Sequence, residues 1–174
     1  MIIMDTTPEI NLEKIKKLAV VFESENLDFR TYLKNYAHSK QIDIMVQRLN
    51  GIYSNAIDCT QCGNCCKELQ PSLAENDIAF MASVKNCTVQ QFENEHTQYD
   101  ELDKYRFMKS QPCLFLKEKK CSIYENRPAS CDEYPHLNKP DFKYRLKSVL
   151  ANYELCPIVY NVVEALKKET HFKK

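Results

Sequence analysis

Four cysteines stand within eight residues of this chain, at Cys59, Cys62, Cys65 and Cys66. Two residues between successive cysteines is a spacing that lets two sulfurs reach one metal ion or cluster across a tight turn, and it occurs twice in succession here. Thiolates prefer soft ions, so this segment favours zinc or iron–sulfur over magnesium or calcium. The sequence therefore predicts a metal site before it predicts a reaction.

Five further cysteines follow: Cys87, Cys113, Cys121, Cys131 and Cys156. The first residues show no basic region followed by a long apolar stretch, and no apolar run approaches the roughly 18 residues of a membrane helix. We therefore expect a cytoplasmic protein without a membrane segment. Because the cytosol keeps thiols reduced, and because nine is an odd number, metal ligation is favoured over the alternative of a disulfide framework.

The adjacent pair Cys65 and Cys66 suggests two centres, because successive side chains of an extended segment point to opposite sides. A distant Cys156 followed by Pro157 is similar to the cysteine–proline that completes ligation in ferredoxin-type four-iron clusters. We expect either one site or two. For two, the predicted sets are Cys59, Cys62, Cys65 and Cys156 in one, and Cys66, Cys113, Cys121 and Cys131 in the other.

The segment around Cys113 and Cys121 resembles a short hairpin, and its register tests the second set. If Leu116 pairs with Cys121, the alternation of a strand places Cys113 on the other face of the hairpin. If Phe115 pairs with Cys121, both sulfurs share one face. For two cysteines that bind one centre, we predict the Phe115 register or a bulge.

Other residues have weaker claims to the site. Gly63 lies between Cys62 and Cys65, where the absence of a side chain lets the backbone turn closely around a metal. Cys87 lies in no spacing motif and is most simply a buried apolar thiol. His136 and Asp77 are candidate additional ligands, with a surface histidine and a solvated carboxylate as the alternatives. Hydrogen-bond donors to sulfur are expected among Tyr124, Arg127 and Tyr134, unless these residues serve packing or surface pairing.

The elements that must position these residues are mainly helical. Apolar residues recur with a helical period before residue 58, which predicts two amphipathic helices, the first capped at Thr7–Pro8 and the second ending near Gly51. Two capping boxes, Ser72-x-x-Glu75 and Thr88-x-x-Gln91, predict helices through about residue 84 and from about 91 to 99. A further helix is predicted after Pro157.

The expected fold is therefore mainly α with a small β-hairpin. Its predicted organisation is an N-terminal helical arm over residues 1–58 and a cysteine-cluster metal-binding domain with a C-terminal helix over residues 59–174. The chain holds 24 basic and 24 acidic residues, so no net field favours nucleic acid or an anionic membrane. We expect no nucleic acid, no membrane and, as a candidate, a protein partner at the helical arm.

Several motifs resemble the YkgJ-type cysteine-cluster proteins, a bacterial family of zinc- or iron-chelating domains. They are Cys59-x-x-Cys62-Gly63-x-Cys65-Cys66, Glu75-x-Asp77-Ile78, Pro112-Cys113-x-Phe115-Leu116, Cys121-Ser122-Ile123-Tyr124-Glu125-x-Arg127-Pro128-x-x-Cys131, Tyr134-Pro135 and Cys156-Pro157. The chain departs from the pattern at Asp132, where a basic residue commonly follows the cysteine, and at His136, where an aromatic residue often follows Tyr-Pro.

The resemblance implies a cytoplasmic protein that binds Zn²⁺ or an iron–sulfur cluster, such as 4Fe–4S, through its eight motif cysteines. A similar cluster occurs in flagellin lysine-N-methylase, which adds methyl transfer as a remote alternative. Whether the protein is an enzyme is left open, since no glycine-rich nucleotide-binding loop is present. The two main hypotheses are redox or group-transfer chemistry at iron–sulfur, and a non-catalytic interaction module held by structural zinc.

Overall fold

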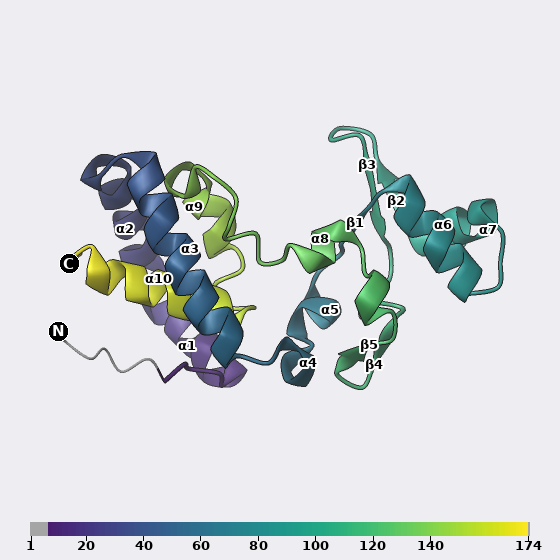
Figure 1. Cartoon of the computed structure of the whole chain (residues 1–174), viewed down its shortest axis with the longest axis horizontal. Helices are drawn as coiled ribbons and strands as arrows, with labels where there is room; N and C mark the ends of the chain where they lie inside the picture. The colour runs from purple at the N-terminus through teal and green to yellow at the C-terminus, as the bar shows by residue number, and fades with distance from the viewer. Residues whose placement is uncertain (1–6, 174) are drawn as a thin grey trace. The chain divides into compact units, whose positions relative to one another are not determined.

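The protein is mainly helical, with two small antiparallel sheets, in a computed structural model that describes residues 7–173 (Figure 1). This confirms the expected fold class. Residues 7–58 and 135–173 form one compact unit, here called the helical unit, and Cys59–Tyr134 form a second, here called the cysteine unit. Among the described residues, no helix combines the length and the apolar character needed to cross a membrane.

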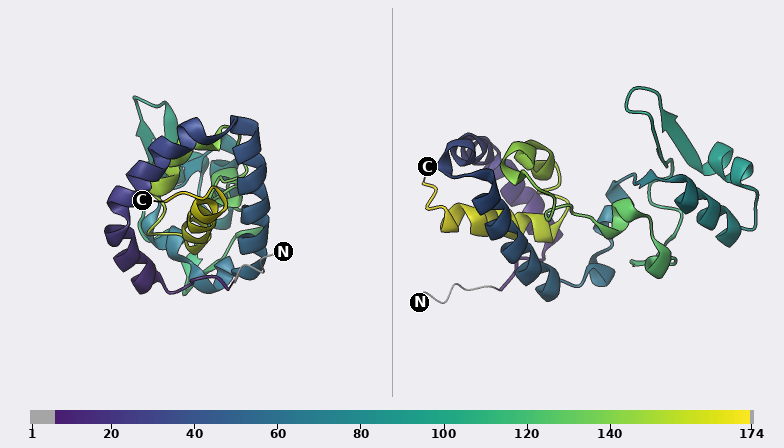
Figure 2. Two further views of the ribbon diagram at one scale, coloured as in Figure 1. Left: turned by 90° about the vertical axis from the view of Figure 1, so that its left-hand side faces the viewer. Right: turned by 45° about the horizontal axis from the view of Figure 1, so that its top comes forward.

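The helical unit contains five helices. They are α1 (Leu12–Val21), α2 (Glu23–Tyr36), α3 (Ser39–Ala56), α9 (Phe142–Leu150) and α10 (Pro157–Glu169). Figure 2 shows α10 end-on, with α1, α2 and α3 arranged around it. The residues of α10 from Pro157 to Val163 are all buried, so this helix is the centre of the core rather than an exposed appendage.

The boundaries of these helices follow local chemistry only in part. Pro157 begins α10 as predicted, because proline has the φ angle of a helix and its missing N–H is not needed in the first turn. The arm contains three helices rather than two, and the Asn11 side chain caps the first by accepting from the Lys14 N–H at 3.1 Å. The predicted cap at Thr7 and the predicted stop at Gly51 were wrong, since Gly51 lies inside α3.

The predicted domain boundary at residue 58 also marks the start of the cysteine unit, but the structure groups residues 135–173 with the N-terminal helices. Residues 135–173 belong to this unit because their helices pack on the N-terminal ones. Helix α10 packs on α3 and α1, while α9 packs on α2 and α3. Polar contacts add to this packing. The ammonium of Lys167 in α10 lies 2.8 Å from the Glu25 carboxylate of α2, and the Asn161 amide accepts the Glu9 N–H at 3.0 Å.

The cysteine unit has short helices and two sheets. Its helices are α4 (Cys59–Cys62), α5 (Asn64–Glu68), α6 (Glu75–Val84), α7 (Val89–His96), the 3₁₀-helix η1 (Tyr124–Asn126) and α8 (Ala129–Asp132). Its strands are β1 (Ser72–Leu73), β2 (Thr97–Asp100), β3 (Tyr105–Met108), β4 (Leu116–Lys117) and β5 (Lys120–Cys121). The first three form an antiparallel sheet in the order β1-β3-β2, and β4 pairs with β5.

One apolar cluster joins these pieces. It contains Leu73, Ile78, Met81, Ala82, Phe92, Met108, Phe115 and Ile123, all of them buried. Phe115 and Ile123 are the two members that come from the segment carrying the later cysteines, so this core anchors the β4–β5 hairpin to α6 and α7. Cys113 and Cys121 are partly buried against the same cluster.

The capping predictions for α6 and α7 had different outcomes. Thr88 and Gln91 form the predicted capping box, with the Thr88 hydroxyl accepting the Gln91 N–H at 3.2 Å and the Gln91 side chain accepting the Thr88 N–H at 2.9 Å. The helix ends at His96, because the chain continues into the unpredicted hairpin of β2 and β3. Ser72 lies in β1 instead of capping α6.

Candidate metal centre

Gly63 lies at the turn between α4 and α5 and brings the first cysteines against the β4–β5 hairpin. Its φ angle is +61°, and its N–H donates to the Cys59 carbonyl at 3.1 Å. A Cβ at this position would lie 2.7 Å from the backbone carbonyl oxygen of Lys119, in the β4–β5 turn. Glycine is therefore required twice, for the left-handed conformation and for the close approach of a second backbone.

A backbone hydrogen bond holds Cys66 beside Cys113. The Cys113 N–H donates to the Cys66 carbonyl at 2.7 Å, and the Gln111 side chain donates to the Glu68 carbonyl at 2.9 Å. These two bonds fasten the segment that precedes β4 to α5. Two cysteines far apart in the sequence are thereby placed next to each other.

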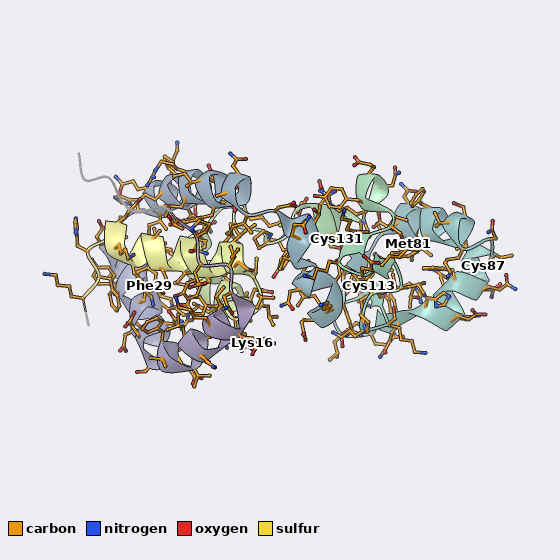
Figure 3. The ribbon with its side chains drawn as sticks, turned by 90° about the horizontal axis from the view of Figure 1, so that it is seen from below. Lys16, Phe29, Met81, Cys87, Cys113 and Cys131 are labelled. Atoms are coloured by element: carbon orange, nitrogen blue, oxygen red, sulfur yellow. The ribbon has the colours of Figure 1, made fainter. Side chains whose placement is uncertain are left out.

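The other two cysteines reach this place on β5 and α8. Cys121 ends β5, and Cys131 lies in α8, whose Ser130 hydroxyl donates to the Ser72 carbonyl of β1 at 2.7 Å. Figure 3 shows Cys113 and Cys131 close together, with Met81 of the apolar core nearby and Cys87 at the far end of the unit. The cysteines of α5, β5, α8 and the segment before β4 thus lie in one region of the cysteine unit.

The four thiols are also close enough to affect one another's pKa. Burial raises the pKa of the Cys113, Cys121 and Cys131 thiols, that of Cys131 to about 12, and neighbouring thiols of the group raise each further. For Cys66, a hydrogen bond with the Cys65 thiol is the first cause of its raised pKa, ahead of burial. Every pair among Cys66, Cys113, Cys121 and Cys131 interacts in this way.

Donors from the protein oppose these effects and are suited to a thiolate. The backbone N–H of Phe115 hydrogen-bonds to the Cys113 sulfur and that of Ile123 to the Cys121 sulfur, and each lowers the pKa of its thiol. The Ser130 side chain also lowers the pKa of the Cys131 thiol, although its hydroxyl hydrogen is donated to the Ser72 carbonyl. Donors to sulfur orient metal ligands and stabilise their charged form. We did not predict these two backbone donors; in both, the signal is an apolar residue placed two positions after a cysteine.

The predicted register of the hairpin was wrong. Leu116 pairs with Cys121 and Lys117 with Lys120, across a two-residue turn in which Glu118 has a φ of +58°. The expected consequence, opposite faces for Cys113 and Cys121, does not follow. Cys113 precedes β4 and begins a turn, closed by the Leu116 N–H donating to the Cys113 carbonyl at 2.9 Å, so strand alternation does not apply to it.

The premise for separating Cys65 from Cys66 also needs correction. Both lie in α5 rather than in an extended segment, and their thiols are hydrogen-bonded to each other. Side chains of adjacent helical residues still leave the axis in different directions, so the grouping of Cys66 with the later cysteines is compatible with a helix. The backbone bond from the Cys113 N–H to the Cys66 carbonyl supports this grouping, which stays a prediction.

The donor set fits a thiophilic metal, but the side chains are not already in ligand positions. Within residues 7–173, no three His, Cys, Asp or Glu side chains are placed to bind one ion. The nine cysteines, all within that range, are thiols rather than disulfides. Because metal ligands must be thiolates, metal binding requires that the four thiols lose their protons.

The remaining predicted ligands are distributed over both units. Cys59 is exposed, while Cys62 and Cys65 are half-buried, and all three lie on α4 and α5. Cys156 is buried in the helical unit, where it is the N-cap residue of α10 as expected. The assignment of Cys59, Cys62, Cys65 and Cys156 to one centre stays a prediction.

Three other candidates have structural positions of their own. Cys87 follows α6, packs against the apolar cluster and directs its thiol to the Ala82 carbonyl at 3.7 Å. The Asp77 carboxylate accepts the Ala74 N–H at 2.8 Å and so caps α6. His136 belongs to the helical unit and has a φ of +59°; its carbonyl accepts from Arg145 at 3.2 Å. Cys87 and Asp77 thus make hydrogen bonds at α6, and the roles of Asp77 and His136 as additional ligands stay predictions.

Comparison with known proteins gives one match. The family described as "CxxCxxCC: Putative zinc- or iron-chelating domain" matches residues 58–157, which is more than half of the chain. No curated protein and no solved structure matches. The similarity to flagellin lysine-N-methylase therefore stays a prediction.

Proposed function

Because the chain belongs to the CxxCxxCC family of putative zinc- or iron-chelating domains, we propose that it is a metal-binding protein whose centre is formed by Cys66, Cys113, Cys121 and Cys131. The observation that carries this proposal is the convergence of these four thiols from α5, β5, α8 and the segment before β4. All four come from the cysteine unit alone.

Four sulfur ligands suit two metals. Zn²⁺ in a structural site takes four ligands in a tetrahedron, and iron accepts the same thiolate geometry. With four protein ligands the coordination shell is complete, which favours a structural or electron-transfer role over one that binds substrate at an open position. Bound iron would make the centre redox-active, whereas bound zinc would make the protein a non-catalytic interaction module.

The experiment is anaerobic purification followed by metal analysis and visible absorption spectroscopy. We expect stoichiometric zinc or iron in the wild-type protein and its loss when Cys66, Cys113, Cys121 and Cys131 are all replaced by serine. Iron would show thiolate-to-metal absorption, while zinc would leave the protein colourless. The matched control is Cys87→Ser, which removes a thiol from the same unit but outside the four.

Three results would count against the proposal. A wild-type protein without zinc or iron after anaerobic purification and reconstitution would contradict metal binding itself. A fourfold serine variant with the full wild-type metal content would contradict this choice of ligands and transfer the site to other cysteines. Loss of metal in Cys87→Ser would show that the core, and not ligation, controls the metal content.

A protein partner at the N-terminal helices stays a prediction. What supports it is a shallow surface pocket of about 580 Å³ at the junction of α2 and α3, lined by Tyr36, Ala37, Gln41, Ile44 and Met45. Ile44 is 58% exposed there, although the opposite face of α3 is buried in the helical unit. Such a surface fits the alternative in which zinc is structural and the N-terminal helices bind the protein partner.

A further inference from the structure

Arg127 connects the segment that follows Cys121 with the helix that carries Cys131. It stands between η1 and α8, and its Nη1 donates to the Tyr124 carbonyl at 2.7 Å. Its Nη2 pairs with the carboxylate of Asp132, the residue that follows Cys131. The guanidinium also lies over the Tyr124 ring, 3.9 Å from the ring centroid. Three contacts therefore hold this side chain in one position.

The geometry depends on properties that belong to arginine. A planar guanidinium donates from two nitrogens in different directions while its face stacks on an aromatic ring, whereas a lysine ammonium is a compact charge on a flexible stem. The side chain of Arg127 is 23% exposed, so its charge is only partly screened by water. Asp132, where the family pattern often has a basic residue, is thus the partner that fixes the guanidinium.

The positive charge of Arg127 can offset the negative charge of a metal site formed by four thiolates. Four thiolates around a divalent ion leave a net charge of about −2, which is costly in a partly buried position unless positive groups are near. The guanidinium is held by the Tyr124 carbonyl, three residues after Cys121, and by the carboxylate of Asp132, the residue that follows Cys131. In the absence of metal, the same group has no thiolate to neutralise.

We propose that Arg127 is a positioning residue of the metal centre, which joins the Cys121 and Cys131 segments and compensates the negative charge of the metal-bound thiolates. This inference rests on the proposed function and adds a residue that binds no metal itself. It predicts that Arg127 contributes to metal affinity far more than to the fold of the metal-free protein.

The test is a comparison of Arg127→Gln, Arg127→Lys and the control Arg106→Gln in the full-length protein. Arg106 is a matched arginine of the same unit. It lies over the Tyr99 ring at 5.6 Å, is 3.5 Å from the Glu93 carboxylate, and has a side chain that is 28% exposed. It differs from Arg127 in its position on β3 and in its partners Tyr99, Glu93 and Thr97, none of which is next to a ligand cysteine in the sequence.

The first measurement is the Zn²⁺ dissociation constant, by competition with a chromophoric chelator. Substitution of groups that support metal ligands typically weakens binding by about 10- to 100-fold, and we expect that range for Arg127→Gln. Arg127→Lys keeps the charge and loses the two-pronged contact, so its affinity should lie between Arg127→Gln and wild type. Arg106→Gln should bind Zn²⁺ within about twofold of wild type, since it removes the ion pair with Glu93 and the hydrogen bond to the Thr97 hydroxyl but no contact with a residue next to a ligand cysteine in the sequence.

The second measurement is the absorption spectrum of the Co²⁺-loaded variants, which reports the thiolate ligands directly. We expect a changed sulfur-to-cobalt band in Arg127→Gln and an unchanged one in Arg106→Gln. Thermal unfolding of the chelator-treated proteins supplies the structural control: Arg127→Gln and Arg106→Gln should lose similar stability. If Arg127→Gln fails to fold, the inference is tested by comparing the Zn²⁺ affinity and Co²⁺ spectrum of Arg127→Lys with those of wild type.

Equal Zn²⁺ affinity and equal Co²⁺ spectra for Arg127→Gln and Arg106→Gln would overturn the inference and leave the proposed function intact. So would an Arg127→Lys variant that binds no better than Arg127→Gln, because the retained charge would then have no effect. A wild-type protein that binds neither Zn²⁺ nor Co²⁺ would instead reject the proposed function, and the two failures are thereby distinguished.

Discussion

Gly63 is the residue whose substitution is most constrained by the backbone. Alanine there must adopt a φ near +61° and place its Cβ 2.7 Å from the Lys119 carbonyl oxygen. A left-handed non-glycine residue costs about 1–2 kcal/mol before any clash is counted. We expect Gly63→Ala to lower the free energy of unfolding by about 2 kcal/mol or more and to reduce metal content, measured by urea unfolding and metal analysis.

The second glycine of the chain is the control. Gly51 lies within α3, and a Cβ added there meets nothing within 4 Å. Gly51→Ala should therefore stabilise the protein by about 0.5–1 kcal/mol, the usual difference between the two residues in a helix. If Gly63→Ala changed the free energy of unfolding as little as Gly51→Ala does, the backbone at Gly63 would accept a Cβ without strain, and this prediction would be wrong.

The raised thiol pKa values predict how pH acts on the metal-free protein. Folding raises the pKa of Cys113, Cys121 and Cys131 above the ordinary value of 9.0, so the folded state binds protons more strongly than the unfolded state. Their contribution to stability is fully present below pH 9 and is lost as the pH rises through the folded values. Urea unfolding of the reduced, chelator-treated protein should show stability decreasing between about pH 9 and 12.

The Cys131→Ser variant provides the comparison for this pH dependence. Its serine does not ionise in that range, so the loss of stability at high pH should be smaller than in wild type. An identical pH profile in the two proteins would contradict the burial of Cys131 as its cause.

At the scale of elements, the N-terminus of α9 is capped by a side chain from another helix, α3. Asp141, which precedes α9, has a φ of +59° and no side-chain cap bond of its own. The carboxylate of Asp43, in α3, accepts the N–H groups of Asp141 and Phe142, both at 2.9 Å. A carboxylate at a helix N-terminus satisfies free donors and interacts favourably with the helix dipole.

We therefore expect Asp43→Ala to destabilise the helical unit by about 1–2 kcal/mol, as for the loss of an N-cap. Asp43→Asn keeps one oxygen acceptor and should cost less. Asp28, an exposed carboxylate in the middle of α2, is the control, and Asp28→Ala should change stability by no more than about 0.5 kcal/mol. Circular dichroism during urea unfolding measures all three; equal losses for Asp43→Ala and Asp28→Ala would reject the cap.

For the whole molecule, the two units should respond differently to metal removal. The helical unit has a continuous apolar core around α10, whereas the cysteine unit has short helices and strands around a smaller cluster. Metal binding is coupled to folding in small metal domains. We expect a chelator to open residues 59–134 to trypsin while α1–α3, α9 and α10 stay protected, measured by limited proteolysis and mass spectrometry.

The exposed lysines Lys85 and Lys119 are the reporters in the cysteine unit, and Lys147 in α9 is one in the helical unit. The result against this prediction is cleavage at all three positions at the same chelator concentration. It would mean that the two units unfold together, and that metal stabilises the entire chain.

The sequence by itself determined the features that depend on a few neighbouring residues. Pro157 and the apolar run after it specify α10, Thr88 and Gln91 specify the start of α7, and the cysteine spacing identifies the family of metal-chelating domains. In each, the interacting groups are within one or two turns of each other. The side chains alone therefore contain the information.

Only the tertiary structure decided which thiols meet and which segments share a core. The Cys66–Cys113 backbone bond, the contact of Gly63 with Lys119 and the return of residues 135–173 to the N-terminal helices all join distant segments. The hairpin register was mispredicted for the same reason, since Cys113 is held by a turn and by α5 rather than by strand pairing. Such contacts depend on the free energy of the whole fold, which no local pattern contains.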